Sequence, residues 1–215
     1  MSAFYRDAYN HLTIEGLPLD ALMAEFGSPL YVYSGTGLER ALTAFQAAVA
    51  PVSGKVHFAL KANSALGVIA LLARCGAGAD IVSAGELARA LAAGIKPSDM
   101  VFSGVGKTDD EIRQALACGI GQINAESPAE VAAISAISRE MKLRAPVALR
   151  VNVDVDPSTH VKISTGQRDT KFGISTSRQK ASKLYKQLVN DPHIEPSGLA
   201  VHIGSQIRDI LPFEH

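Results

Sequence analysis

The sequence predicts an α/β fold built from successive strand–helix units. Short apolar runs alternate with longer Ala/Leu-rich segments of helical periodicity, and this spacing favours parallel strands joined by right-handed crossovers. Capping signals also recur at the ends of the helical segments. The pattern by itself fits either an open doubly wound sheet or a (β/α)8 barrel. A closed barrel needs about eight strands and roughly 250 residues, and the chain has 215 residues.

Seven apolar runs are predicted to be strands. The first, Leu30–Tyr33, follows the turn-forming residues Gly27–Pro29 and stands outside the rhythm of the others. The six barrel-type strands are Val56–Leu60, Ala79–Val82, Met100–Phe102, Gln122–Asn124, Val147–Val151 and Leu199–Ile203. Helical patterns lie between successive strands: Ala65–Arg74, Glu86–Ala93, Asp109–Ala117, Ala129–Met141 and Arg178–Val189.

The predicted helices share their start and stop signals. Three starts have the S/T-x-x-E spacing of a capping box, namely Ser83–Glu86, Thr108–Glu111 and Ser127–Glu130. Three ends carry a glycine where a left-handed residue is expected, namely Cys75-Gly76, Ala93-Gly94 and Cys118-Gly119. Because the two cysteines occupy equivalent helix ends, they are predicted to be packing residues.

Composition limits the classes of function. The chain is 47% apolar and 20% charged, and its 21 basic residues balance 21 acidic residues. Without a Lys/Arg-rich run, nothing indicates binding to nucleic acid or to an anionic membrane surface. The first ten residues lack the apolar core of a signal peptide, and no apolar run approaches the roughly 18 residues of a membrane span. Two cysteines form neither a disulfide framework nor a zinc motif. A soluble, cytoplasmic protein without a metal is expected.

Lys61 is the first candidate for chemistry. It ends the run VHFALKAN, in which strand alternation places His57, Ala59 and Lys61 on one face. The C-terminal ends of parallel strands are where α/β folds place their active sites. Partial burial there would favour the neutral amine that Schiff-base chemistry needs. The alternative is a strand-end lysine whose ammonium simply reaches water along its own stem.

His202 and Ser205 form the second signal, in the run GLAVHIGSQ. The imidazole of His202 could stack on a planar ring, and Ser205 could donate to a phosphate oxygen. Gly204 between them would let the backbone approach a ligand. A core histidine bonded to a carbonyl is the structural alternative.

Other polar residues also end strands. Asp80, Asn124 and Arg150 each follow an apolar run, and each could equally mark the point where the strand emerges into solvent. Lys61, Asp80, Arg150 and His202 occupy the same ends of their strands, so they are predicted to converge at one mouth of the sheet. Glu86 is already explained by the capping box with Ser83.

One apparent phosphate-binding motif does not hold. Residues 104–108, GVGKT, resemble the end of a P-loop, but the motif requires a glycine where Val101 stands. Thr108 is also sufficiently explained as a helix N-cap. Nucleotide binding is therefore not predicted here.

Taken together, the runs VHFALKAN, GADIVSAGEL and VHIGSQI resemble the fold-type III pyridoxal-phosphate-dependent decarboxylases, which have an alanine-racemase-like barrel. Within that group the chain is most similar to the diaminopimelate decarboxylases. The runs that carry this likeness are EGLPLDALMAEFGSPLYVYS, FSGVGKTDDEI, RVNVDVDPSTHVKISTG and TKFGI. Segments His160–Gly166 and Lys171–Ile174 are not expected in ornithine decarboxylase or alanine racemase. The chain departs from the family pattern at Ser83–Glu86, where two glycines are commoner, and at Val153, where a proline is common.

The resemblance implies a role for each candidate residue. Lys61 matches the lysine that binds pyridoxal 5'-phosphate covalently, His202 the histidine stacked on the cofactor ring, and Ser205 a phosphate contact. Asp80, Glu86 and Arg150 match polar residues around the cofactor and Lys61. The implied reaction is decarboxylation of meso-2,6-diaminoheptanedioate (diaminopimelate) to L-lysine, the last step of lysine biosynthesis.

The resemblance also implies a domain organisation. Residues 1–34 match an N-terminal segment, and residues 35–215 match a pyridoxal-phosphate-binding (β/α)8 barrel with about six of its eight strands and no C-terminal β domain. Because the phosphate loop and the acidic partner of the pyridine nitrogen lie further along in the family, the chain is expected to be inactive alone. A homodimer is expected for the full-length enzyme.

Three alternatives remain open at this point. The chain could belong to a non-catalytic, pyridoxal-phosphate-binding regulatory homologue, although the long run His160–Gly166 favours an enzyme. It could decarboxylate another basic amino acid, ornithine or arginine. It could also use a Schiff-base lysine without a cofactor, but His202 and Ser205 would then have no evident role.

Overall fold

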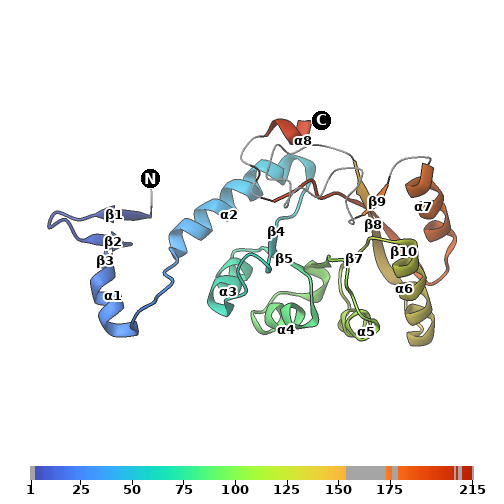
Figure 1. The fold of residues 1–215 in the computed structure, drawn as a ribbon, viewed down its shortest axis with the longest axis horizontal. Helices are drawn as coiled ribbons and strands as arrows, with labels where there is room; N and C mark the ends of the chain where they lie inside the picture. The colour runs from blue at the N-terminus through green and yellow to red at the C-terminus, as the bar shows by residue number, and fades with distance from the viewer. Residues whose placement is uncertain (1–2, 154–172, 176–178, 206, 208–209, 215) are drawn as a thin grey trace.

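The fold is given by a computed structural model that describes residues 3–153, 173–175, 179–205, 207 and 210–214. A small N-terminal unit comes first (Figure 1). In it, strands β1 (Phe4–Arg6), β2 (Leu12–Ile14) and β3 (Leu17–Pro18) form an antiparallel sheet, followed by helix α1 (Leu19–Phe26). Sequence reasoning left all four of these elements unassigned.

A curved parallel sheet forms the body of the protein. Its strands are β4 (His57–Ala59), β5 (Gly78–Ile81), β6 (Met100–Phe102), β7 (Gln122–Ala125), β8 (Ala145–Asn152) and β10 (Ile194–Ala200). They pair side by side in chain order, and every pairing is parallel. The short strand β9 (Ile174–Ser175) adds to the far end of β8.

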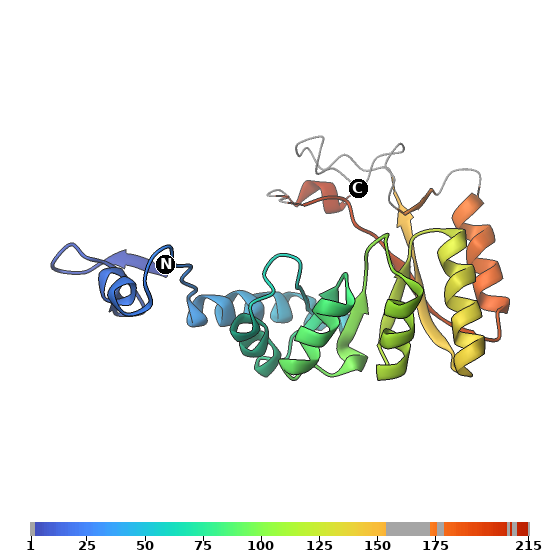
Figure 2. The ribbon, with the colours of Figure 1, turned by 60° about the horizontal axis from the view of Figure 1, so that its bottom comes forward.

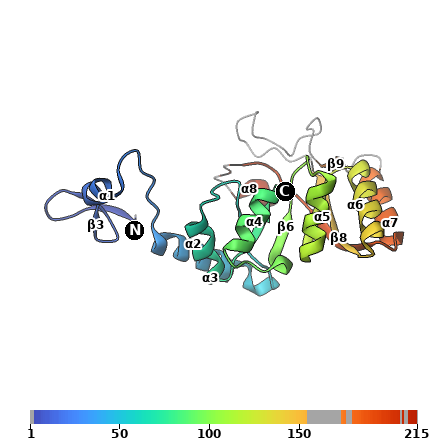
Figure 3. The same ribbon diagram turned by 90° about the horizontal axis from the view of Figure 1, so that it is seen from below.

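The helices alternate with these strands. They are α2 (Gly35–Val49), α3 (Leu66–Arg74), α4 (Ala84–Ala92), α5 (Asp109–Cys118), α6 (Pro128–Met141), α7 (Lys180–Asn190) and α8 (Leu211–Glu214), with the 3₁₀ turns η1 (Ala50–Val52) and η2 (Pro97–Asp99). Helices α3 to α7 follow one another in an arc along one side of the sheet (Figures 1 and 2). From below, the same helices lie in a row in chain order (Figure 3).

This topology decides between the two folds that the sequence left open. A doubly wound sheet reverses its strand order and has helices on both faces. Here the order β4-β5-β6-β7-β8-β10 never reverses, and the crossover helices lie on one face. The fold is therefore of the (β/α) barrel type, with six consecutive barrel strands in the described residues.

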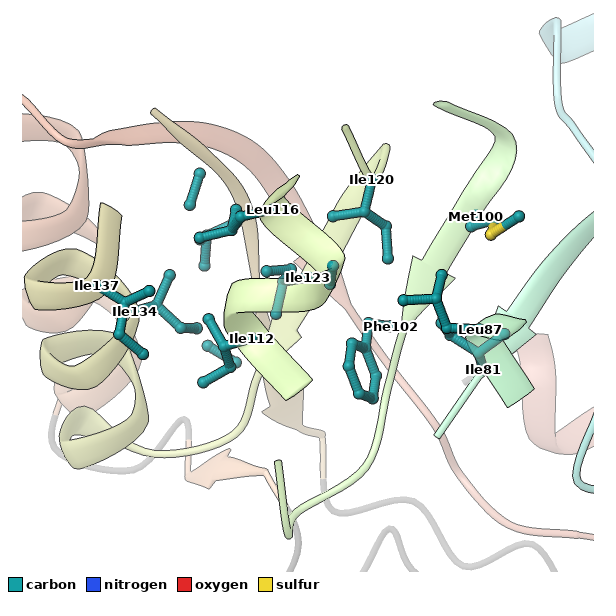
Figure 4. Packing of buried hydrophobic residues seen from close by; sticks show 14 of the residues in the cluster. Ile81, Leu87, Met100, Phe102, Ile112, Leu116, Ile120, Ile123, Ile134 and Ile137 are labelled. Atoms are coloured by element: carbon teal, nitrogen blue, oxygen red, sulfur yellow. The ribbon is translucent and has the colours of Figure 1, made fainter. Parts of the chain in front are cut away.

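The main core lies between the sheet and the helices. In the close-up, Ile81, Phe102 and Ile123 project from the strands toward Leu87, Ile112 and Ile134 on the helices (Figure 4). Each of these strand side chains is fully buried. Burying an aliphatic or aromatic side chain of this size stabilises the fold by about 1.5–3 kcal/mol. The packing of the helices on the outer face of the sheet therefore stabilises the fold.

The helix starts confirm the predicted N-caps, with one refinement. The side chains of Ser83, Thr108 and Ser127 each accept a hydrogen bond from the backbone three residues on. Only Thr108 and Glu111 complete the reciprocal box. The carboxylates of Glu86 and Glu130 accept a hydrogen bond instead from the backbone N–H of the residue that precedes each N-cap, at 2.8 Å in both cases. These bonds connect each helix to the end of the preceding strand.

The predicted left-handed glycines are confirmed at all three helix ends. Gly76, Gly94 and Gly119 have φ values of 85°, 87° and 79°. Glycine adopts this region without the steric cost that a Cβ would bring.

Two predicted strands need correction. Leu30–Tyr33 forms no strand; a strand needs a hydrogen-bonded partner, and the side chains of Tyr31 and Tyr33 lie exposed. The last predicted strand, Leu199–Ile203, is displaced toward the N-terminus: β10 ends at Ala200. The apolar pattern predicted the wrong strand boundaries because β10 includes Pro196 and Gly198, between which its register with β8 shifts.

Among the described helices, none combines the length and the apolar character needed to cross a lipid bilayer.

Candidate active site

The inner face of the sheet, opposite the helices, is polar. Because side chains alternate along a strand, the neighbours of the buried outer residues point inward. Asp80 on β5, Ser103 after β6 and Asn124 on β7 all line a cavity of about 540 Å³. That volume falls within the roughly 300–1,000 Å³ of small-molecule sites. The inner face therefore forms a site rather than a second core.

The cavity joins the predicted site residues. Its lining includes Lys61, Asp80, Arg150, His202 and Ser205, which come from the ends of β4, β5 and β8 and from the segment after β10. The predicted convergence of Lys61, Asp80, Arg150 and His202 is confirmed by this geometry. Their individual contacts with a cofactor stay predictions.

Lys61 lies just beyond the end of β4, in a turn closed by the bond from Ala62 N to Ala59 O at 3.1 Å. The residue is exposed in the part of the chain that the structure describes, and its partial burial in the complete protein stays a prediction. The turn carries the side chain past the strand end to the rim of the cavity, where its ammonium can be reached by a ligand.

Arg150 is held by a buried carboxylate. One guanidinium nitrogen, Nη1, lies 2.9 and 3.0 Å from the two oxygens of Glu126. The Glu126 side chain is only 2% exposed and that of Arg150 is 12% exposed. Charge-assisted hydrogen bonds of this kind are stronger than neutral ones, so Glu126 keeps the cation of Arg150 at the cavity wall.

The two histidines of the cavity favour the neutral form. Partial burial lowers the pKa of His202, and the positive charges of Lys61 and Arg150 lower it further, against the opposing effect of Asp80 and Glu126. Burial likewise lowers the pKa of His57, against the effect of Asp80 and Asp99. At neutral pH both rings are therefore uncharged, which suits His202 for stacking on a planar ring.

Glu86 is the one predicted site residue that the structure does not bring to the cavity lining. Its carboxylate oxygen accepts from Val82 N at 2.8 Å, and its own backbone N–H donates to Ser83 Oγ. These bonds give Glu86 a structural role at the start of helix α4.

The rejected phosphate motif proves to contain a structural lysine. The Lys107 side chain is 1% exposed, and its ammonium donates to Gly104 O, Asn124 O and Glu130 Oε1 at 2.6–2.7 Å. Its three protons are thus used within the protein.

Sequence reasoning missed three residues of this region: His57, Ser103 and Glu126. His57 was placed on the face of Lys61 but not proposed as a site residue, and it does line the cavity. Ser103 and Glu126 directly follow β6 and β7, so their strand-end positions were the available signal. Asn124 was noted for that reason and also lines the cavity. The runs His160–Gly166 and Lys171–Ile174 fall mainly outside the described residues.

The cysteines lie away from this cavity. Cys75 packs beside Leu72 and Ala77, and Cys118 packs against the main core. Cys118 Sγ donates to Ala115 O at 3.1 Å, and burial raises the pKa of its thiol, which keeps it protonated. No described cluster of three or more His, Cys, Asp or Glu side chains is arranged to hold a metal ion.

We therefore expect the double variant Cys75→Ser/Cys118→Ser, made in the protein expressed from its complete reading frame (the complete protein below), to keep its catalytic rate within a few-fold. Serine preserves size, and neither thiol touches the cavity. Steady-state kinetics beside a far-UV circular dichroism spectrum checks this. A rate loss of a hundredfold in a folded variant would place one of the thiols in the chemistry.

Comparison with known proteins supports a specific family. The family model for the pyridoxal-binding domain of pyridoxal-dependent decarboxylases matches residues 36–215. The curated diaminopimelate decarboxylase of Zymomonas mobilis is 48% identical over 206 residues, which are 94% of this chain and 48% of that protein. The chain thus spans about half the length of such relatives.

Solved structures agree. The diaminopimelate decarboxylase of M. jannaschii, in complex with L-lysine, superposes with a TM-score of 0.91 at 33% identity, over 99% of this chain and 50% of that one. The Helicobacter pylori enzyme, also with L-lysine, gives a TM-score of 0.86 at 38% identity, over 90% of this chain and 49% of that one.

Proposed function

The chain belongs to the pyridoxal-dependent decarboxylase family, and from that premise we propose that the complete protein decarboxylates meso-diaminopimelate to L-lysine with pyridoxal 5'-phosphate as cofactor. The observation that carries this proposal is the single cavity that joins Lys61, Asp80, Arg150, His202 and Ser205 at the carboxyl ends of the strands. The substrate is the one named for the relatives with 48% and 38% identity.

The chemistry of the lining residues fits the cofactor. A reachable primary amine, Lys61 Nζ, can bind its aldehyde carbon covalently. The hydroxyl of Ser205 can donate to a phosphate oxygen, and the neutral ring of His202 can stack on the pyridine. All three residues line the same cavity. When bound, pyridoxal phosphate supplies an electron sink for the pair of electrons released as carbon dioxide leaves.

The protein's own groups hold and orient the reactants. Lys61 would hold the cofactor through its side-chain amine. Arg150, held by Glu126, presents a cation to the cavity, and Asp80 presents a carboxylate. Groups held in place beforehand spend no reorganisation energy during the reaction. The cation of Arg150 would attract a carboxylate of the substrate and help to orient it.

The test supplies the complete protein and pyridoxal phosphate with diaminopimelate, and follows carbon dioxide release and L-lysine formation. Parallel assays use L-ornithine and L-arginine. Turnover of diaminopimelate in preference to both supports the proposal. Preference for ornithine or arginine would change the substrate, and cofactor binding without any carbon dioxide release would indicate a non-catalytic homologue.

Three further points stay predictions: the boundary between an N-terminal segment at 1–34 and a barrel domain at 35–215, the homodimer, and the cytoplasmic location. Light scattering on the complete protein would measure the assembly state.

A further inference from the structure

A hydrogen-bonded ladder crosses three strands on the cavity wall. Ser103 Oγ donates to Asp80 Oδ1 at 2.5 Å, and Asn124 Nδ2 donates to Ser103 Oγ at 3.0 Å. Gln122 Nε2 in turn donates to Asn124 Oδ1 at 2.8 Å. Asp80, Ser103 and Asn124 all line the cavity, so the ladder is part of its surface.

The direction of every hydrogen bond in this ladder follows from the negative charge of the Asp80 carboxylate. An ionised carboxylate can only accept, and a serine hydroxyl has a single proton. Asp80 therefore takes the proton of Ser103, and the oxygen of Ser103 must accept from the amide of Asn124. That fixes which end of the Asn124 amide faces Ser103 and leaves its oxygen for Gln122. Only one arrangement of donors satisfies all four groups.

The ladder fixes the orientation of Asp80. With Oδ1 bound to Ser103, the carboxylate cannot rotate about its terminal bond without breaking a charge-assisted hydrogen bond. No described residue makes a hydrogen bond to the other oxygen, Oδ2. Asp80 also lies in register with Ala59, two residues before Lys61 on the adjacent strand. The fixed carboxylate therefore faces the space beside Lys61.

From this geometry we propose that Ser103 is a positioning residue: it holds the Asp80 carboxylate in the orientation that binds the cofactor and substrate. The inference rests on the proposed function for its catalytic part. Ser103 acts through Asp80, and Asn124 holds Ser103 in turn.

The structure contains a matched control. Ser135 Oγ donates to Asp191 Oδ2 at 2.5 Å, the same bond at the same distance, between α6 and the end of α7. Neither of these residues lines the cavity. Ser103→Ala and Ser135→Ala thus remove chemically identical bonds, one inside the site and one outside it. Ser103→Thr keeps the hydroxyl and serves as the conservative variant.

The experiment measures three quantities on the complete protein: the thermal unfolding midpoint without cofactor, the dissociation constant of pyridoxal phosphate by fluorescence titration, and kcat and KM for diaminopimelate. We expect similar midpoints for the two alanine variants. We expect Ser103→Ala alone to weaken cofactor binding or lower kcat/KM by roughly 10- to 100-fold, the equivalent of a hydrogen bond to a charged group. Ser103→Thr should recover most of that loss.

Equal cofactor affinity and equal kcat/KM in wild type and Ser103→Ala would overturn the inference, as would equal losses in Ser103→Ala and Ser135→Ala. The failure of the proposed function is distinguishable. If wild type turns over no diaminopimelate, the function is wrong, while the cofactor titration still decides whether Ser103 positions the site. If Ser103→Ala does not fold, Asn124→Ala, which removes the support of Ser103 but keeps its hydroxyl, should give an intermediate loss in the same titration, and no loss there would count against the proposal.

Discussion

Replacing Lys61 with alanine is expected to lower decarboxylation by the complete protein roughly a thousandfold, a loss comparable with that of a catalytic acid–base group. The loss is expected because Lys61 supplies the amine that holds the cofactor, and it lines the cavity beside His202 and Ser205. Borohydride reduction followed by peptide mass spectrometry should find the cofactor on Lys61 in wild type and nowhere in the variant.

Lys55 provides the control for this substitution. It precedes the same strand, β4, at the opposite end, where its ammonium lies 3.0 Å from Asp99 and its side chain is 72% exposed. An exposed pair of this kind contributes about 0–1 kcal/mol, so Lys55→Ala should leave the rate and the covalent adduct unchanged. A reduced adduct on any lysine other than Lys61 would refute the assignment.

Replacing Lys107 with methionine is expected to destabilise the fold by about 3–5 kcal/mol, the usual cost of removing one partner from a buried ion pair. The variant leaves the carboxylate of Glu130, whose side chain is 12% exposed, without its positively charged partner. It also removes the hydrogen-bond donor of the Gly104 and Asn124 carbonyls. Denaturant unfolding of the complete protein measures this directly. The double variant Lys107→Met/Glu130→Gln should recover a large part of the loss, because it removes the unpaired charge.

The pair of Arg113 and Glu140 is the comparison for this second prediction. These side chains are 40% and 56% exposed, and water screens their attraction. Arg113→Met should therefore cost far less than Lys107→Met. If Lys107→Met costs as little as Arg113→Met, the buried ammonium is not important for stability.

Much of the fold follows from signals that act over a few residues. The caps at Ser83, Thr108 and Ser127 and the glycines after the helices each depend on groups within one helical turn. Alternation along β4 likewise placed His57 and Lys61 on one face, and both line the cavity. Such local rules failed at Leu30–Tyr33 and at the end of β10, because pairing with another strand decides whether an extended segment counts as a strand.

The order of strand–helix units, the ends of the helices and the strand-end residues that meet at one mouth could be predicted from the amino-acid sequence. The hydrogen bonds and ion pairs between side chains at that mouth could not. The bonds of Ser103 to Asp80 and Asn124, of Glu126 to Arg150 and of Lys107 to Glu130 join residues 21 to 24 positions apart. One complete βα unit separates the partners in each case. Local propensity does not reach across such a unit, and contact between them requires the register of neighbouring parallel strands, which the packing of helices against the outer face of the sheet sets.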